Sequence, residues 1–369
     1  MTQDLNRAMY GWDESFEESF QDASSEGTAY LPARIVREDR GLYRAIADGT
    51  EYAAEITGAF RNAHAHSDEF PAVGDWVVTA PVGDEEKLRI HAVLPRKTVF
   101  KRTAVGTTSE TQVVAANVDT IFIVMGLDGD FNPRRVERYI ALAYESGAQP
   151  VVVLSKSDVS DIVPEQVVQI EDVAFGVPVH PISSLQDDGL EFLSEYICVG
   201  KTIALLGSSG AGKSTLVNAL MGNQTMDTGE VREDDSRGRH TTTHRQLVVL
   251  PTGGLLIDTP GMREIQLTGD DESIGSTFGD VEALFDQCRF RDCQHDQEPG
   301  CAIQGAIDSG ELDAKRYKSY LKLKRELAFT QRRQSESFAQ EEKQRNRAFS
   351  KMVRKSLAER KKMGIKPDR

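Results

Sequence analysis

A glycine-rich loop at residues 207–214 constrains the fold of this chain more than any other feature. Its sequence, GSSGAGKS, matches the pattern GxxxxGK[ST], follows the apolar run TIALL and precedes the helix-prone segment STLVNALMG. In this context the backbone N–H groups of the loop bind phosphates at the N-terminus of a helix. The sequence therefore predicts a P-loop nucleotide site formed by Gly207, Ser208, Ser209, Gly210, Ala211, Gly212, Lys213, Ser214 and Thr215.

A second motif indicates which base is bound. Residues 155–158, SKSD, end the apolar run QPVVVL and resemble the guanine-reading motif [NT]KxD. Asp158 would accept hydrogen bonds from the ring N–H and the amine of guanine, which adenine does not offer. Lys156 would lie along the base. We expect GTP-binding by Ser155, Lys156, Ser157 and Asp158, and by Ser183 and Ser184, which resemble the loop that closes over the guanine oxygen. An ATP-using P-loop enzyme is the alternative.

The magnesium side of the site is predicted from three segments. Lys213 would reach the β- and γ-phosphates, and the hydroxyl of Ser214 would bind Mg²⁺. In DTPG, residues 258–261, Asp258 would supply the metal-side carboxylate and the N–H of Gly261 would sense the γ-phosphate. Thr242, in the cluster RHTTTH, is our choice for the second magnesium hydroxyl, with its two threonine neighbours as alternatives.

The water-orienting group is less clear from the sequence. Many GTPases place Gln directly after DxxG, but this chain has Met262 there, so we expect a low intrinsic rate and a partner that completes the site. His240 is our candidate for orienting water, and an ordinary surface histidine is the alternative. The expected catalytic set is therefore His240, Lys213, Thr242 and Gly261.

The order of these motifs is unusual, because the guanine-reading half precedes the phosphate loop. Circular permutation of one sheet explains this order, since chain ends that lie close together can be moved. From residue 118 onward apolar strand-like runs alternate with helical patterns, which favours a mostly parallel α/β sheet. We assign residues 110–275 to a circularly permuted P-loop GTPase domain.

The region before this domain has a different pattern. Five short β-type runs lie between residues 30 and 96, which predicts a small antiparallel β-barrel over 28–98. An OB-type barrel fits, and other small barrels fit as well. Residues 1–27 contain seven acidic residues and one Arg, and we expect an acidic disordered leader there.

Cysteine spacing predicts a metal site after the GTPase domain. Cys288, Cys293, His295 and Cys301 fall within fourteen residues and form a Cys₃His set, which suits one structural Zn²⁺. We expect a helical zinc-binding module over 276–330. The remaining cysteine, Cys198, is expected to be a small buried apolar residue.

Charge is distributed unevenly along the chain. Residues 315–369 contain 19 Lys/Arg and 6 Asp/Glu, whereas the other 314 residues contain 25 and 52. We expect a basic, helix-prone tail over 331–369 that can meet an RNA phosphate backbone, and a solvated tail without a partner is the alternative. No apolar run reaches the ~20 residues that cross a bilayer, and the first residues do not resemble a signal peptide. We therefore expect a cytoplasmic protein without a membrane partner.

The permuted motifs and the cysteine pattern together resemble the RsgA/YjeQ family of GTPases, over about residues 30–328. Ser155 departs from the family pattern, which usually has Asn or Thr there. The resemblance implies an OB-fold, a permuted GTPase domain and a zinc domain. It also implies hydrolysis of GTP to GDP, stimulated by the small (30S) ribosomal subunit during its late maturation, and contact with rRNA. We expect a monomer. A GTP-dependent ribosome-binding switch with negligible turnover is the alternative, motivated by Met262.

Overall fold

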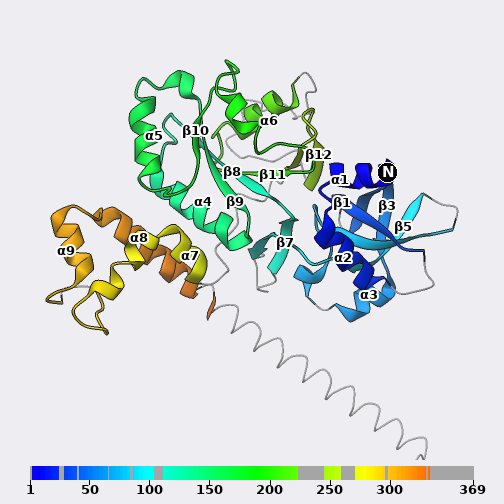
Figure 1. Ribbon diagram of the computed structural model, residues 1–369, viewed down its shortest axis with the longest axis horizontal. Helices are drawn as coiled ribbons and strands as arrows, with labels where there is room; N and C mark the ends of the chain where they lie inside the picture. The colour runs from blue at the N-terminus through cyan, green and yellow to red at the C-terminus, as the bar shows by residue number, and fades with distance from the viewer. Residues whose placement is uncertain are drawn as a thin grey trace, which may run out of the picture.

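Three parts follow one another along the chain in the computed structural model of Figure 1: a β-barrel, an α/β domain and a C-terminal helical module. The α/β domain lies between the other two. The structure describes residues 2–24, 29–39, 41–64, 66–83, 86–103, 111–222, 245–258, 271–295, 298–329 and 331–332.

The barrel is closed by five strands, which pair in the order β1-β2-β3-β5-β4 and back to β1. All pairs are antiparallel except β3 with β5. Inward side chains such as Ile35, Tyr43 and Ile90 fill its interior. The OB-type barrel, which five short β-type runs suggested alongside other small barrels, is confirmed. Its elements are β1 (Leu31–Asp39), β2 (Leu42–Ala47), β3 (Thr50–Ile56), α3 (Gly58–Ala63), η1 (Ser67–Glu69), β4 (Trp76–Pro81) and β5 (Lys87–Val93).

The N-terminal leader is not a disordered acidic segment, contrary to the prediction. It forms α1 (Thr2–Met9) and α2 (Glu14–Ala23), and the Asp13 side chain caps α2 by accepting from the backbone of Phe16. Trp12 and Phe16 pack against Trp76 of the barrel, with a Trp12–Trp76 centroid distance of 4.6 Å. The leader folds despite its acidic composition, because aromatic residues spaced four apart give the helix an apolar face that packs against the barrel.

A buried arginine joins the leader, the barrel and the α/β domain. The Arg34 guanidinium donates to the carbonyl oxygens of Gly74 (3.2 Å), Asn117 (3.1 Å) and Tyr10, and to the Thr202 hydroxyl (2.9 Å). Burial lowers the Arg34 pKa to about 10. Because a buried cation without acceptors is costly, these four bonds hold the parts in one arrangement.

The α/β domain has a mostly parallel sheet, as predicted. The order is β10-β9-β8-β11-β13-β12, in which only β12 runs antiparallel to its neighbour. β12 also pairs with β1 of the barrel, so one sheet runs through both parts. The strands are β8 (Thr120–Gly126), β9 (Gln149–Ser155), β10 (Val179–Pro181), β11 (Thr202–Leu206), β12 (Arg245–Val249) and β13 (Leu255–Asp258). A separate pair, β6 (Val99–Thr103) with β7 (Thr111–Ala116), was not expected from the sequence.

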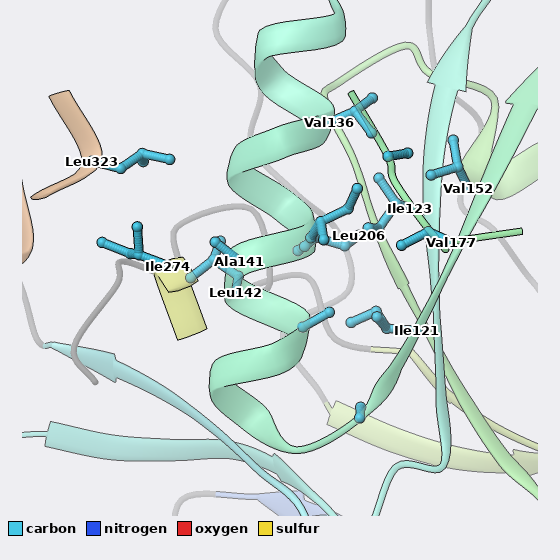
Figure 2. Packing of buried hydrophobic residues seen from close by; sticks show 14 of the residues in the cluster. Ile121, Ile123, Val136, Ala141, Leu142, Val152, Val177, Leu206, Ile274 and Leu323 are labelled. Carbon is cyan, nitrogen blue, oxygen red and sulfur yellow. The ribbon is translucent and has the colours of Figure 1, made fainter. Parts of the chain in front are cut away.

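Helix α4 (Pro133–Ser146) is the centre of the largest core. Asn132 caps its N-terminus, and Gly147, at φ 84°, ends it. Figure 2 shows α4 between the sheet, which contributes Ile121, Ile123 and Leu206, and the C-terminal module, which contributes Ile274 and Leu323. The other elements of the domain are η2 (Ser157–Val159), α5 (Val163–Glu171), η3 (Leu190–Leu193) and α6 (Lys213–Met221).

The C-terminal module is helical, as predicted. It consists of α7 (Asp271–Thr277), α8 (Gly279–Glu282), η5 (Phe285–Gln287), α9 (Ala302–Ser309) and a helical segment over 314–329. Arg316 enters the interface with α4 and donates to the buried Glu137 at 2.9 Å and to Asp280 at 2.7 Å. In the described part of the chain, no helix has the length and apolar character needed to span a membrane.

Candidate functional site

The phosphate loop connects β11 to α6 with the geometry that its glycines permit. Gly207 has a φ of 155°, and a Cβ there would lie 2.3 Å from the Val124 carbonyl oxygen. The Lys213 ammonium folds over the loop and donates to the carbonyls of Gly207 (2.7 Å) and Ser208. At the start of α6, Ser214 and Thr215 are exposed. Backbone N–H groups and a lysine at a helix N-terminus form a site for phosphate groups.

The predicted base-reading motif lies against this loop. The Ser155 hydroxyl donates to the Ala211 carbonyl at 2.6 Å, and the Lys156 ammonium donates to the Gly210 carbonyl at 2.6 Å. Lys156 itself has a left-handed backbone, with φ 62°, and such strain is typical of functional sites. The two residues therefore fix consecutive carbonyls of the loop. Although Ser155 is shorter than Asn and lacks the methyl group of Thr, its hydroxyl reaches the loop.

The carboxylate of Asp158 is exposed beside the second predicted base loop. Ser183 donates to Asp158 Oδ1 at 2.6 Å, and the Ser157 N–H donates to the Ile182 carbonyl at 3.1 Å. The Ser184 hydroxyl oxygen is buried and has no hydrogen-bond partner among the described residues. The exposed Asp158 carboxylate thus offers polar atoms for a ligand at this edge of the sheet.

The predicted magnesium side is described only in part. Asp258 ends β13, which runs parallel to β11, so its carboxylate lies at the same sheet edge as the phosphate loop and Ser214. Carboxylate and hydroxyl oxygens are suitable ligands for Mg²⁺. His240, Thr242 and Gly261 lie outside the described residues, as does Met262.

Two carboxylates beside the phosphate loop were missed by the sequence analysis. Asp128 and Asp130 follow β8, and each contacts part of the predicted nucleotide site. The hydrogen bond from Lys156, at 2.7 Å, holds the Asp128 pKa below its usual range. Their position after a buried parallel strand could have identified them, since the carboxyl ends of such strands form ligand sites.

The Cys₃His set is brought together by the C-terminal module. The ligand atoms of Cys288, Cys293, His295 and Cys301 lie within 4.8 Å of one another. Nδ1 of His295 is 3.4 Å from the Cys288 sulfur and 3.7 Å from the Cys301 sulfur. Zn–S and Zn–N bonds of about 2.3 and 2.1 Å at tetrahedral angles require S···N separations of about 3.6 Å. The geometry therefore fits one metal ion.

Surroundings of the cluster orient its histidine. The Phe285 ring stacks on the His295 ring at 4.4 Å, and Gln304 donates to the His295 carbonyl at 3.0 Å. The Ala302 N–H donates to the Cys288 sulfur at 3.3 Å, as is common for a metal-bound thiolate. The prediction that Cys198 is buried is wrong. Its side chain is exposed, because the neighbouring Ile197 occupies the core position instead.

Comparison with known proteins decides between families of P-loop enzymes. A family model described as RsgA GTPase matches residues 93–268. A protein from Opitutus terrae named "Small ribosomal subunit biogenesis GTPase RsgA" is 47% identical over 349 residues, 91% of this chain and 93% of that protein. The chain belongs to the RsgA family. A protein of the same name from Xanthomonas axonopodis pv. citri is 50% identical over 81% of each chain.

Solved structures agree with RsgA membership. The crystal structure of YjeQ from Thermotoga maritima matches with a TM-score of 0.60 and 27% identity, over 81% of this chain and 99% of that one. YloQ, described as a circularly permuted GTPase, has the same fold, with a TM-score of 0.58 over 83% of this chain and 98% of its own. A model of the ABC transporter also matches residues 190–348, which include the phosphate loop common to P-loop proteins. As a member of the RsgA GTPase family, the chain is a GTP hydrolase.

Proposed function

We propose that this GTPase binds the small ribosomal subunit and assists its late maturation, with GTP hydrolysis stimulated by the subunit. One observation above all supports the proposal: Ser155 and Lys156 donate hydrogen bonds to carbonyls of the phosphate loop, so the segments predicted to read the base and to bind phosphate lie together. The two relatives described above are both named for small ribosomal subunit biogenesis.

The nucleotide would span the edge of the sheet. Asp158 would read the guanine N–H groups, and Ser183 and Ser184 would close over the base. The loop from Gly207 to Thr215 would hold the phosphates. Mg²⁺ would be bound by Ser214, Thr242 and Asp258, and it would neutralise charge that develops on the phosphates.

Hydrolysis would need a group that orients the attacking water. His240 is our candidate, with the N–H of Gly261 and the Thr242 hydroxyl on the γ-phosphate side. Since Met262 cannot hydrogen-bond to water as Gln does, the reaction would be slow until the subunit completes or reorders the site.

Zinc is the metal that suits the C-terminal cluster. Three thiolates and one imidazole fill a tetrahedral shell and leave no position for a reactive water, which is typical of structural Zn²⁺. The ion would stabilise the loops between η5 and α9, which have few apolar residues of their own. The module and the barrel would then contact rRNA, with the protein acting as a cytoplasmic monomer.

Co-sedimentation tests the proposed partner. The protein should sediment with small subunits in the presence of a non-hydrolysable GTP analogue, less with GDP, and not with large subunits. Equal sedimentation in both nucleotide states, or with both subunits, would contradict the proposal.

The second candidate is a GTP-dependent binding switch that scarcely turns over, and Met262 favours it. Phosphate release that stays at the basal rate when small subunits are added would support this alternative.

A further inference from the structure

We propose that Asp128 and Asp130 are positioning residues for GTP hydrolysis, one acting at the base side and one at the phosphate side of the site. Both lie in the turn between β8 and α4. β8 is flanked by β9, which leads to the base-reading motif, and by β11, which leads into the phosphate loop. The Asp128 carboxylate contacts the segment that follows β9, and the Asp130 carboxylate contacts the segment that follows β11.

Asp128 holds the lysine of the base-reading motif. Its Oδ2 accepts from the Lys156 ammonium at 2.7 Å, and the same ammonium donates to the Gly210 carbonyl at 2.6 Å. A lysine side chain is flexible, so a second fixed partner restricts it to the conformation that reaches the loop. Gly126 makes this possible, because a Cβ there would lie 2.7 Å from Asp128 Oδ1.

Asp130 holds the N-terminal part of the phosphate loop through Ser208. One oxygen accepts from the Ser208 hydroxyl, and the other pairs with Arg135 of α4. The Asp130 side chain is only 19% exposed, and its N–H donates to Asp128 Oδ1 at 3.0 Å, so the turn is braced internally. The carboxylate therefore ties the loop to the first turn of α4.

The two aspartates act on different residues of the phosphate loop. Gly210, which Lys156 binds, is next to the base-reading motif. Ser208 is next to the Lys213 ammonium, which binds its carbonyl and is the group that reaches the β- and γ-phosphates. Loss of Asp128 should therefore weaken binding of GTP and GDP alike, whereas loss of Asp130 should chiefly slow hydrolysis.

Steady-state and binding measurements on the full-length protein separate these effects. For Asp128→Asn we expect the Kd of GDP and the KM for GTP to rise together by about threefold, as for a partly exposed ion pair, with kcat unchanged. For Asp130→Asn we expect kcat to fall about tenfold, as for a weakened charge-assisted hydrogen bond that positions the phosphate loop, with the Kd of GDP changed less than about twofold.

Ser208→Ala removes the hydrogen bond that Asp130→Asn weakens, since a neutral amide oxygen accepts less strongly than a carboxylate. In a double-mutant cycle, the two changes together should therefore lower kcat by less than the product of their separate effects. Glu165→Gln, on the exposed surface of α5, is the matched control and should behave as the parent. Thermal melting of every variant checks the fold. If an aspartate variant does not fold, Ser208→Ala alone still tests the contact between Asp130 and the phosphate loop.

Two results would overturn the inference. One is an Asp130→Asn variant with parental kcat. The other is full additivity of Ser208→Ala and Asp130→Asn, which would show that they act separately. A parent protein that hydrolyses no GTP would instead contradict the enzyme assignment, so the two failures are distinguishable.

Discussion

The Ser183 hydroxyl donates a 2.6 Å hydrogen bond to Oδ1 of Asp158 and so fixes the carboxylate between two loops. Each carboxylate oxygen can accept two hydrogen bonds, so both oxygens keep capacity for guanine. If Asp158 reads the base as proposed, this hydrogen bond couples the second loop to base recognition even though Ser183 is 25 residues away along the chain.

Asp158→Asn should weaken GTP and GDP binding together by about a hundredfold or more, about 2.7 kcal/mol, because a donor replaces an acceptor opposite the guanine N–H groups. Xanthosine triphosphate, which has a carbonyl in place of the guanine amine, should bind the variant better than GTP does. Fluorescent nucleotide titration measures both. Parental GTP affinity in the variant would remove Asp158 from the site.

Metal analysis of the purified protein should find about one Zn²⁺ per chain. Cys293→Ser should reduce the zinc content and lower the melting temperature of the C-terminal module, and it should impair binding to small subunits more than binding of GDP. Cys198→Ser, which removes the exposed thiol, is the matched control. A preparation free of metal that melts at the same temperature would refute the prediction.

The leader helices should contribute to stability. Phe16 is buried against Trp76, so Phe16→Ala should cost about 3 kcal/mol and lower the melting temperature of the barrel. The protein has two tryptophans, Trp12 and Trp76, which contact each other, so tryptophan fluorescence, excited selectively over tyrosine, follows this region alone. Phe175→Ala, at a residue 85% exposed, should leave the transition unchanged. Equal melting temperatures of the Phe16→Ala and Phe175→Ala variants would mean that the leader does not stabilise the barrel.

Deletion of residues 331–369 removes 13 Lys/Arg and 5 Asp/Glu, a net change of 8 charges. We expect unchanged nucleotide affinity, weaker binding to small subunits and a shallower salt dependence. The reason is counterion release, which contributes a slope of about 0.9 for each phosphate neutralised. Titrations of both proteins at several salt concentrations measure the slopes. Identical affinity and slope would leave the tail as a solubilising segment.

Much of this architecture could be predicted because its signals are local. The apolar run before Gly207 and the glycines of the loop specify a strand, a turn and a helix in sequence order. The cysteine spacing likewise restricts the ligands to one short segment. Short β-type runs separated by turn residues identified the barrel strands, and the number of strands was sufficient to suggest their closure.

The unpredicted features depend on contacts between distant segments. Nothing near Arg34 in the sequence indicates acceptors at Asn117 and Thr202, and nothing near Glu137 indicates Arg316. The acidic composition of the leader concealed an aromatic face, because composition does not report spacing. Asp128 and Asp130 stand outside the known motifs; their position after a buried strand suggests a ligand site, and the strand order places them beside the phosphate loop.

Phosphate release from GTP, with and without small ribosomal subunits, tests the central claim most directly. We predict slow release by the protein alone, stimulation by small subunits but not by large subunits, and no release from ATP. Lys213→Ala, which loses the ammonium over the phosphate loop, should abolish the activity in both conditions while the melting temperature stays unchanged. GTP hydrolysis that small subunits do not stimulate, or equal hydrolysis of ATP, would contradict the account.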